Sequence, residues 1–208
     1  LDLPDTGNPY SVIASIQDFH FGRLASSMEV NDDTDMDIQE KDLFDAVNRI
    51  LFRIKGFGKP EALYLTVGAD FLNSDNPQIK TSLGLTPQDS YPSHTVLQVR
   101  GTLLYIKLID FLRQFFPKIF IIKCDGNHDK VASLSMYLFI CAFYRNCSDI
   151  ITNFEDKNFR SRQYRKYGNS LLMFDHGEVP IKDIPGIILT EARELVGMTN
   201  NIIYHSGH

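Results

Sequence analysis

Apolar residues form two kinds of pattern along the chain, short continuous runs and longer stretches with helical spacing. Short runs rich in β-branched residues predict buried strands, and they occupy residues 12–16, 62–67, 119–123, 150–153, 163–167, 170–174 and 201–204. Apolar residues at intervals of three and four predict helices, and these occupy residues 38–54, a stretch from Ser93 or Thr95 to about residue 116, residues 131–145 and residues 185–196. Strands and helices therefore alternate, which predicts an α/β fold.

Polar residues gather where the predicted strands end, which is the edge at which open α/β sheets bind ligands. Residues 76–92 form a long loop with Pro77, Gly84, Pro87 and Pro92. Loops of this length in a compact domain are often functional, so we expect this loop to line a substrate cleft.

Length and composition fit one ordinary globular domain covering residues 1–208. The net charge of −5 argues against a protein that coats nucleic acid without sequence preference, because such binding needs many lysine and arginine contacts to phosphates. Three cysteines show neither zinc-ribbon spacing nor the density of a disulfide scaffold. Together with the absence of a signal-peptide pattern, this predicts a cytoplasmic protein.

The longest apolar run, residues 134–144, is too short to span a bilayer and predicts a buried helix. We therefore expect no membrane partner.

Five strand ends carry side chains that bind metal ions or move protons. They are Asp18 with His20, Asp70 with Asn73, Asn127 with His128, His176, and His208. One histidine beside a strand is usually structural, but five such positions at the same edge indicate a site. Carboxylate, amide and imidazole ligands without thiolates suit divalent ions, with Mn²⁺ first and Fe, Zn, Co or Ni as alternatives. Two such ions that share a carboxylate would suit the hydrolysis of phosphate esters.

The same segments resemble the signature of the calcineurin-like metallophosphoesterases, which runs Asp-x-His, Gly-Asp-x-x-Asn, Gly-Asn-His-Asp, His, and Gly-His-x-His. The match extends from Asp18 to His208, and its most specific part is residues 126–129, Gly-Asn-His-Asp. The resemblance implies a four-layer αββα sandwich of two mixed sheets flanked by helices, and a metallophosphoesterase with two divalent metal ions that hydrolyses its substrate by a metal-bridging hydroxide.

The resemblance also implies a role for each residue. Asp18 and His20 would bind the first metal, Asp70 would bridge, and the second would be completed by Asn127, His176 and His208. His128 would be the general acid that protonates the leaving oxygen, with its ring oriented by the side chain of Asn73.

Two departures from the signature stand out. Ala69 is inserted between Gly68 and Asp70, which makes Asp75 an alternative bridging carboxylate, although Asp70 keeps the usual offset to Asn73. The last histidine of Gly-His-x-His is absent after His208, which predicts a chain truncated at its C-terminus with one ligand of the first metal missing. The amino-acid sequence from Gly68 to Asp75, together with residues 86–89, is similar to that of phage or prophage members of this family.

The substrate class stays open between phosphodiesters and phosphomonoesters. Basic and aromatic residues are interleaved at Phe159, Arg160, Arg162, Tyr164, Arg165, Lys166 and Tyr167. Such a mixture can track a nucleic-acid strand or form a solvated hairpin face. We expect a nuclease-like phosphodiesterase first, a monoesterase acting on phosphoprotein or small metabolites second, and a non-catalytic metal-binding scaffold third.

Overall fold

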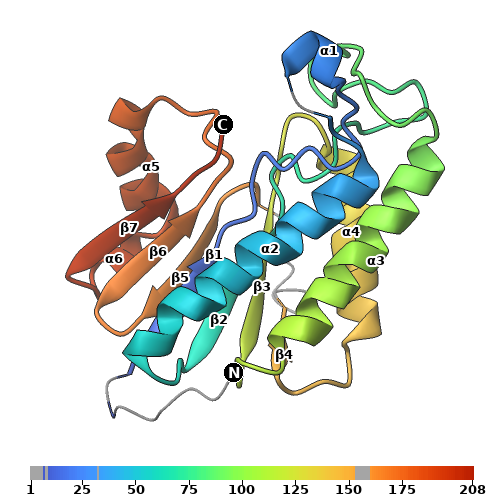
Figure 1. Cartoon of the computed structure of the whole chain (residues 1–208). Helices are drawn as coiled ribbons and strands as arrows, with labels where there is room; N and C mark the ends of the chain where they lie inside the picture. Colours follow the sequence, from blue (N-terminus) through green and yellow to red (C-terminus); the bar gives the residue numbers. More distant parts are fainter. Residues whose placement is uncertain (1–6, 8, 32, 153–159) are drawn as a thin grey trace.

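A computed structural model describes residues 7, 9–31, 33–152 and 160–208, and it shows two sheets between two groups of helices (Figure 1). The elements are β1 (Ser11–Ala14), α1 (Ser27–Val30), α2 (Met36–Ile54), β2 (Ala62–Gly68), α3 (His94–Leu112), β3 (Ile119–Cys124), α4 (Lys130–Phe143), β4 (Ile150–Ile151), β5 (Gln163–Tyr167), β6 (Ser170–Phe174), α5 (Ile184–Glu191), α6 (Arg193–Val196) and β7 (Asn201–His205). Short 3-10 helices at Lys55–Phe57 and Ile181–Asp183 follow α2 and precede α5.

The first sheet has the order β1-β2-β3-β4, and every pair in it is parallel. Helices α2, α3 and α4 connect successive strands and share one apolar core with them. A helical crossover returns the chain to the same end of the sheet, so the next strand runs parallel to the last. The expectation of a mixed sheet is therefore wrong here for the described residues.

The second sheet has the order β5-β6-β7 and is mixed. Strands β5 and β6 form an antiparallel hairpin, whereas β6 and β7 are parallel because α5 and α6 lie between them in the chain. One face of this sheet packs on α5 through Leu171, Met173 and Ile188. Its other face packs on the first sheet through Leu172 and Phe174. The layers are thus helices, parallel sheet, mixed sheet and helices, which confirms the predicted α/β class.

Strand β3 shows why the predicted strands are continuous apolar runs. Ile119 and Ile121 face the helical core, while Phe120 and Ile122 face the second sheet. A strand covered on both faces needs apolar residues at every position.

Side-chain caps define the starts of two predicted helices, and α2 begins at Met36, two residues before the predicted start at Ile38. The carboxylate of Asp35 accepts from the backbone N–H groups of Asp37 and Ile38 at the start of α2. Ser93, one of the two expected caps of α3, accepts from the N–H of Val96.

The helix predicted over residues 185–196 is divided in two at Ala192, which has φ −127° and ψ 29°. Just before the break, the carboxylate of Glu191 accepts from Arg162 and from the hydroxyl of Tyr164. This contact with β5 and the residue preceding it is not visible in the helical spacing of the sequence. Helix α1 was not expected at all.

The prediction of a buried helix over residues 134–144 is wrong for half of that helix. Met136 and Ile140 of α4 are buried in the core beneath it, but Leu138, Phe139 and Phe143 are exposed. Helix α4 is therefore a surface helix with an apolar outer face. No helix in the described part of the chain is long and apolar enough to cross a membrane.

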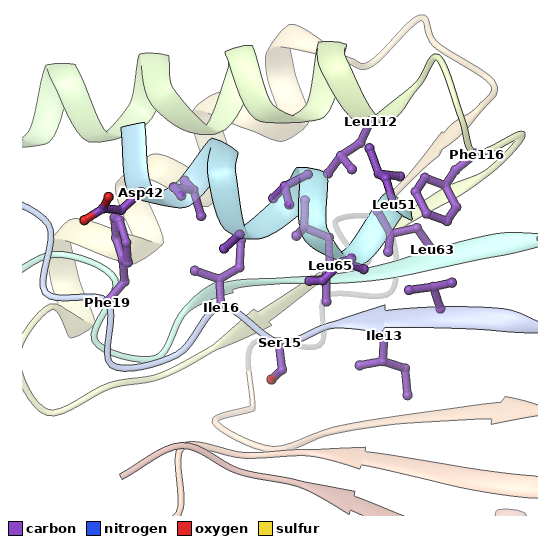
Figure 2. Close-up of a pocket in the computed structure, with 16 residues that line it drawn as sticks. Ile13, Ser15, Ile16, Phe19, Asp42, Leu51, Leu63, Leu65, Leu112 and Phe116 are labelled. Carbon is purple, nitrogen blue, oxygen red and sulfur yellow. The ribbon is translucent and has the colours of Figure 1, made fainter. Parts of the chain in front are cut away.

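A pocket of about 510 Å³ lies between β1 and α2, at the edge of the first sheet (Figure 2). Ile16, Leu51, Leu65 and Phe116 are among the apolar side chains that line it. None of the predicted metal ligands lines this pocket, so the candidate chemistry lies elsewhere in the structure.

An aromatic cluster fixes the loops that leave β1 and β2. The ring of Phe71 stacks on those of Phe19 and Phe21, with centroids 5.3 Å and 5.8 Å away, and lies edge-on to Tyr105 of α3 at 4.4 Å. Tyr105 in turn donates from its hydroxyl to the carbonyl of Thr66 at 2.7 Å. The cluster joins both loops to the helical layer.

Replacing Phe71 by alanine is expected to lower the free energy of unfolding by about 3–5 kcal/mol, because this fully buried ring would leave a cavity among three aromatic partners. Urea denaturation monitored by circular dichroism measures the loss. Phe52→Ala is the control, since the Phe52 side chain on α2 is 74% exposed. Equal losses in the two variants would show that the cluster does not hold the loops.

Candidate metal centre

The loops after β1 and β2 run side by side and are joined through their backbones. The N–H of Asp18 donates to the carbonyl of Ala69, and the N–H of His20 donates to the carbonyl of Asp70, both at 3.0 Å. This pairing places the carboxylate of Asp18 and the ring of His20 next to the Asp70 loop.

Left-handed backbone marks both loops. Asp18, His20, Ala69 and Asp70 have φ of 52°, 49°, 55° and 62°, and Gly68 has φ 88°. This conformation costs a non-glycine residue roughly 1–2 kcal/mol. The inserted Ala69 is thus accommodated by three consecutive left-handed residues, from Gly68 at the end of β2 to Asp70, and they turn the Asp70 side chain into the site.

The buried carboxylate of Asp129 holds this strained turn. Its Oδ1 accepts from the N–H of Asp70 at 3.2 Å, and its Oδ2 accepts from the N–H of Leu72 at 3.0 Å. Burial raises the pKa of Asp129 to about 7, against the effect of these hydrogen bonds. Asp129 therefore holds the loop that carries Asp70.

Asp70 lies at the middle of the candidate centre, with both carboxylate oxygens in use. Oδ1 accepts from the backbone N–H of His128 at 2.6 Å, and Oδ2 lies 3.0 Å from Nε2 of His176. Burial raises the pKa of Asp70, but the hydrogen bonds from His176 and His128 outweigh burial and lower it overall. The carboxylate is therefore held as an anion.

Two groups of side chains could each hold a metal ion, and Asp70 belongs to both. In each group the possible ligand atoms lie within 4.8 Å of one another. The first group contains Asp18, Asp70, His176 and His208; the second contains His20, Asp70 and His128. A buried carboxylate shared by two groups is the arrangement expected for a bridging ligand.

The surroundings of His176 fit a cation. Its Nε2 lies 3.0 Å from the Asp70 carboxylate and 3.0 Å from the amide oxygen of Asn127. Burial lowers the pKa of His176, but the carboxylate of Asp70 outweighs burial and raises it overall. One ring N–H cannot satisfy two oxygen acceptors at full strength, whereas a cation among these atoms would be attracted to all three.

The Nδ1 atoms of His20 and His176 are buried and have no hydrogen-bond partner among the described residues. Buried polar atoms in native proteins are nearly always paired. The imidazole rings of the two groups, together with the carboxylate and amide oxygens, form a donor set that suits a divalent ion of the Mn, Fe, Co, Ni or Zn type.

The structure brings the predicted ligands together but groups them differently. Asp18 was expected beside His20, and their nearest atoms, Oδ1 and Nε2, are 3.9 Å apart. Asp18 belongs instead to the group of His176 and His208, and its Oδ2 accepts from the backbone N–H of His208 at 2.5 Å. His128 was expected to be the general acid and not a metal ligand, yet it belongs to the same group as His20. The ring centroids of these two histidines are 4.5 Å apart.

The expected contact between the Asn73 side chain and His128 is not formed. The Nδ1 atom of His128 lies 3.3 Å from the backbone carbonyl of Asn73. The side-chain amide of Asn73 donates instead to the carbonyl of Asp89 at 3.0 Å, where it fastens the loop of residues 76–92. That loop also contacts the site through Ser82, whose N–H donates to the carbonyl of Asn127 at 2.9 Å.

Asp75, the alternative bridging carboxylate, has another role. Its Oδ1 accepts from the N–H groups of Val131 and Ala132 at 2.8 Å and 2.7 Å. It therefore caps α4 from a distant loop, and it belongs to neither metal group.

Two glycines make the close packing of the centre possible. A Cβ atom on Gly126 would lie 2.1 Å from Oδ1 of Asp70 and 2.3 Å from its backbone nitrogen. A Cβ atom on Gly207 would lie 2.2 Å from Oδ2 of Asp18. Gly126 belongs to the most specific segment of the signature, but the sequence does not show which side chain requires it.

The basic and aromatic stretch is largely engaged within the protein. Arg162 pairs with Glu191 at 2.5 Å, Tyr164 is buried, and the hydroxyl of Tyr167 donates to Glu61 at 2.7 Å. This arrangement favours a hairpin face over a nucleic-acid track. Phe159 lies outside the described residues.

No protein-family model, curated protein or solved structure matches the chain.

Replacing Gly126 by alanine is expected to weaken Mn²⁺ binding by at least about tenfold, because the new methyl group would displace the Asp70 carboxylate. Isothermal titration calorimetry measures the affinity. Gly186→Ala in α5 is the control, since nothing lies within 4 Å of the position of its added Cβ. Unchanged Mn²⁺ affinity in a folded Gly126→Ala variant would show that Asp70 does not bind the metal.

Proposed function

We propose that this protein is a phosphoesterase that depends on two divalent metal ions and belongs with the calcineurin-like metallophosphoesterases. The observation that carries the proposal is the position of Asp70, a buried carboxylate that belongs to both groups of metal-type side chains. The order of motifs from Asp18 to His208 supports it independently.

When bound, two divalent ions would supply Lewis acidity to a phosphoryl group and a water molecule of lowered pKa. Asp70, which belongs to both groups, would be the ligand shared by the two ions. The remaining ligands are divided by their positions in the structure, with His20 on one side and Asp18, His176 and His208 on the other. Asn127 adds its amide oxygen next to His176.

His128 is the residue proposed to transfer a proton to the leaving oxygen. The backbone N–H of His128 donates a hydrogen bond to the carboxylate of Asp70, and its Nδ1 lies 3.3 Å from the backbone carbonyl of Asn73. If Nδ1 carries a proton, it donates to that carbonyl and leaves Nε2 as the atom that exchanges a proton with substrate. The Asn73 backbone would then take the orienting role first assigned to the side chain.

The centre is open to substrate on one side. Asp70 and His176 are buried, whereas the side chains of Asp18 and His20 are 34% and 21% exposed and His208 is exposed. A phosphate group can therefore reach the ligands from the side of Asp18 and His20. We propose phosphodiesters as the first substrates to test, with phosphomonoesters as the alternative.

Asp70→Asn is expected to reduce the Mn²⁺-dependent hydrolysis of bis(p-nitrophenyl) phosphate by at least about 100-fold, because a neutral amide cannot bridge two cations. The matched control is Asp75→Asn, which keeps an oxygen that can accept from the α4 N–H groups. This control should retain most of the wild-type rate.

Three results would count against parts of the proposal. Loss of activity in Asp75→Asn but not in Asp70→Asn would make Asp75 the bridging ligand. Hydrolysis of p-nitrophenyl phosphate but not of bis(p-nitrophenyl) phosphate would indicate phosphomonoesters as the substrate class. Hydrolysis of neither ester by wild-type protein with Mn²⁺ bound would leave a metal-binding scaffold.

A further inference from the structure

Arg23 lies three residues after His20, at the end of a tight turn on the open side of the candidate centre. The N–H of Arg23 donates to the carbonyl of His20 at 2.9 Å, which closes the turn. The side chains of Asp18 and His20 are 34% and 21% exposed on this side, and Arg23 is exposed as well. The turn therefore places an arginine beside the side from which a substrate can reach the centre.

Two neighbouring segments hold this turn in place. On one side, the buried side chain of Gln39 on α2 accepts from the N–H of Gly22 at 2.8 Å and donates to the carbonyl of His20 at 3.0 Å. On the other side, the hydroxyl of Ser90 donates to the carbonyl of Gly22 at 3.1 Å, and Ser90 forms an antiparallel β-bridge with Arg23. The backbone of Arg23 is therefore fixed relative to His20.

The guanidinium of Arg23 has no ion pair or hydrogen bond within the described part of the chain. Three other arginines are paired with carboxylates, as Arg100–Asp37, Arg113–Asp149 and Arg162–Glu191. Arg23 pairs with neither Asp18 nor Asp70, the two carboxylates of the centre. Its charge therefore stands beside the centre and is not neutralised by the residues that the structure describes.

The two sides of the centre differ in charge. Burial lowers the pKa of His20, and the positive charge of Arg23 acts in the same direction. Burial also lowers the pKa of His176, whereas the carboxylates of Asp70 and Glu178 raise it. Glu178 is exposed. A free cation thus lies near His20, and an exposed anion lies near His176.

We propose that Arg23 binds a second phosphate group of the substrate, one that is not hydrolysed. The inference rests on the proposed phosphoesterase activity, which takes the scissile phosphate to the metal ligands. Because Arg23 stands beside these ligands, the anionic group that it meets is the next one along the substrate. A guanidinium can donate two parallel hydrogen bonds to a phosphate, and Glu178 would repel such a group from the other side.

The charge of the whole chain fits a local contact of this kind. A net charge of −5 argues against broad contact with a phosphate backbone, whereas one arginine needs only one additional phosphate. Oligonucleotides carry such a group within the chain, and phosphorylated dinucleotides carry it at an end.

Three thymidine substrates distinguish these cases. The dinucleotide TpT has no second phosphate, pTpT carries one at its end, and the trinucleotide TpTpT carries one within the chain. With Mn²⁺ at low salt, we expect kcat/KM of the wild-type protein to be at least about threefold higher for pTpT and TpTpT than for TpT, mainly through a lower KM. This preference should shrink as the salt concentration rises. Preference for pTpT alone would assign the contact to a terminal phosphate, and preference for TpTpT alone to a phosphate within the chain.

Variants of Arg23 test whether this residue causes the preference. Arg23→Gln removes the charge and should bring the ratio of kcat/KM values close to one. Arg23→Lys keeps the charge without the planar guanidinium and should retain part of the preference. The matched control is Arg53→Gln, at an exposed arginine of α2 that lies about 21 Å further along the helix than Gln39. It should keep the wild-type ratio.

Isothermal titration calorimetry gives a readout that does not depend on hydrolysis. In the presence of Mn²⁺, the wild-type protein should bind thymidine bisphosphate, pTp, at least about threefold more tightly than thymidine monophosphate, pT. Arg23→Gln should bind the two nucleotides with equal affinity.

Several outcomes would overturn the inference and leave the proposed function standing. They are equal kcat/KM values for the three substrates in wild type, an unchanged preference in folded Arg23→Gln, and an equal loss of preference in Arg53→Gln. Cleavage of bis(p-nitrophenyl) phosphate but of none of the three nucleotides would overturn it as well. If no ester is hydrolysed, the proposed function fails, and equal affinities for pTp and pT would then overturn the inference separately.

Discussion

The hydrogen bonds from Asp70 and Leu72 to the buried carboxylate of Asp129 are the contact on which the candidate centre depends. They hold a turn in which Gly68, Ala69 and Asp70 are all left-handed. Without this contact, two N–H groups of that loop would lose their acceptor and the strained turn would lose its support. Because Asp70 stands in both metal groups, the position of this one loop decides whether either group can form.

The layers of the fold explain how distant residues reach this loop. Parallel strands β1, β2 and β3 all end at one edge, so the loops that follow them deliver His20, Asp70 and His128 to one place. The second sheet packs on the first, and the loops after its parallel strands β6 and β7 bring His176 and His208 to the same region. Loop 76–92 is attached to the centre by two hydrogen bonds, from the side chain of Asn73 to the carbonyl of Asp89 and from the N–H of Ser82 to the carbonyl of Asn127.

Apolar patterns predicted most of the elements, because strands covered on both faces and helices covered on one have distinct spacing. The patterns could not show that Glu191 would accept a hydrogen bond from Arg162 just before the helix break at Ala192. They also could not show that Leu138, Phe139 and Phe143 of α4 would be exposed. The residues of the candidate centre were also visible as polar groups at strand ends. Their grouping was not, because it depends on left-handed backbone at Asp18 and His20 and on which atoms of Asn73 and Asp129 make each contact.

The most direct test of the two-metal centre is a crystal structure of the protein with Mn²⁺, with anomalous differences collected at the manganese absorption edge. Two anomalous peaks are expected roughly 3.5–4 Å apart, one on each side of the Asp70 carboxylate, with His20 near one and His176 near the other. A single peak, or peaks that do not contact Asp70, would contradict it.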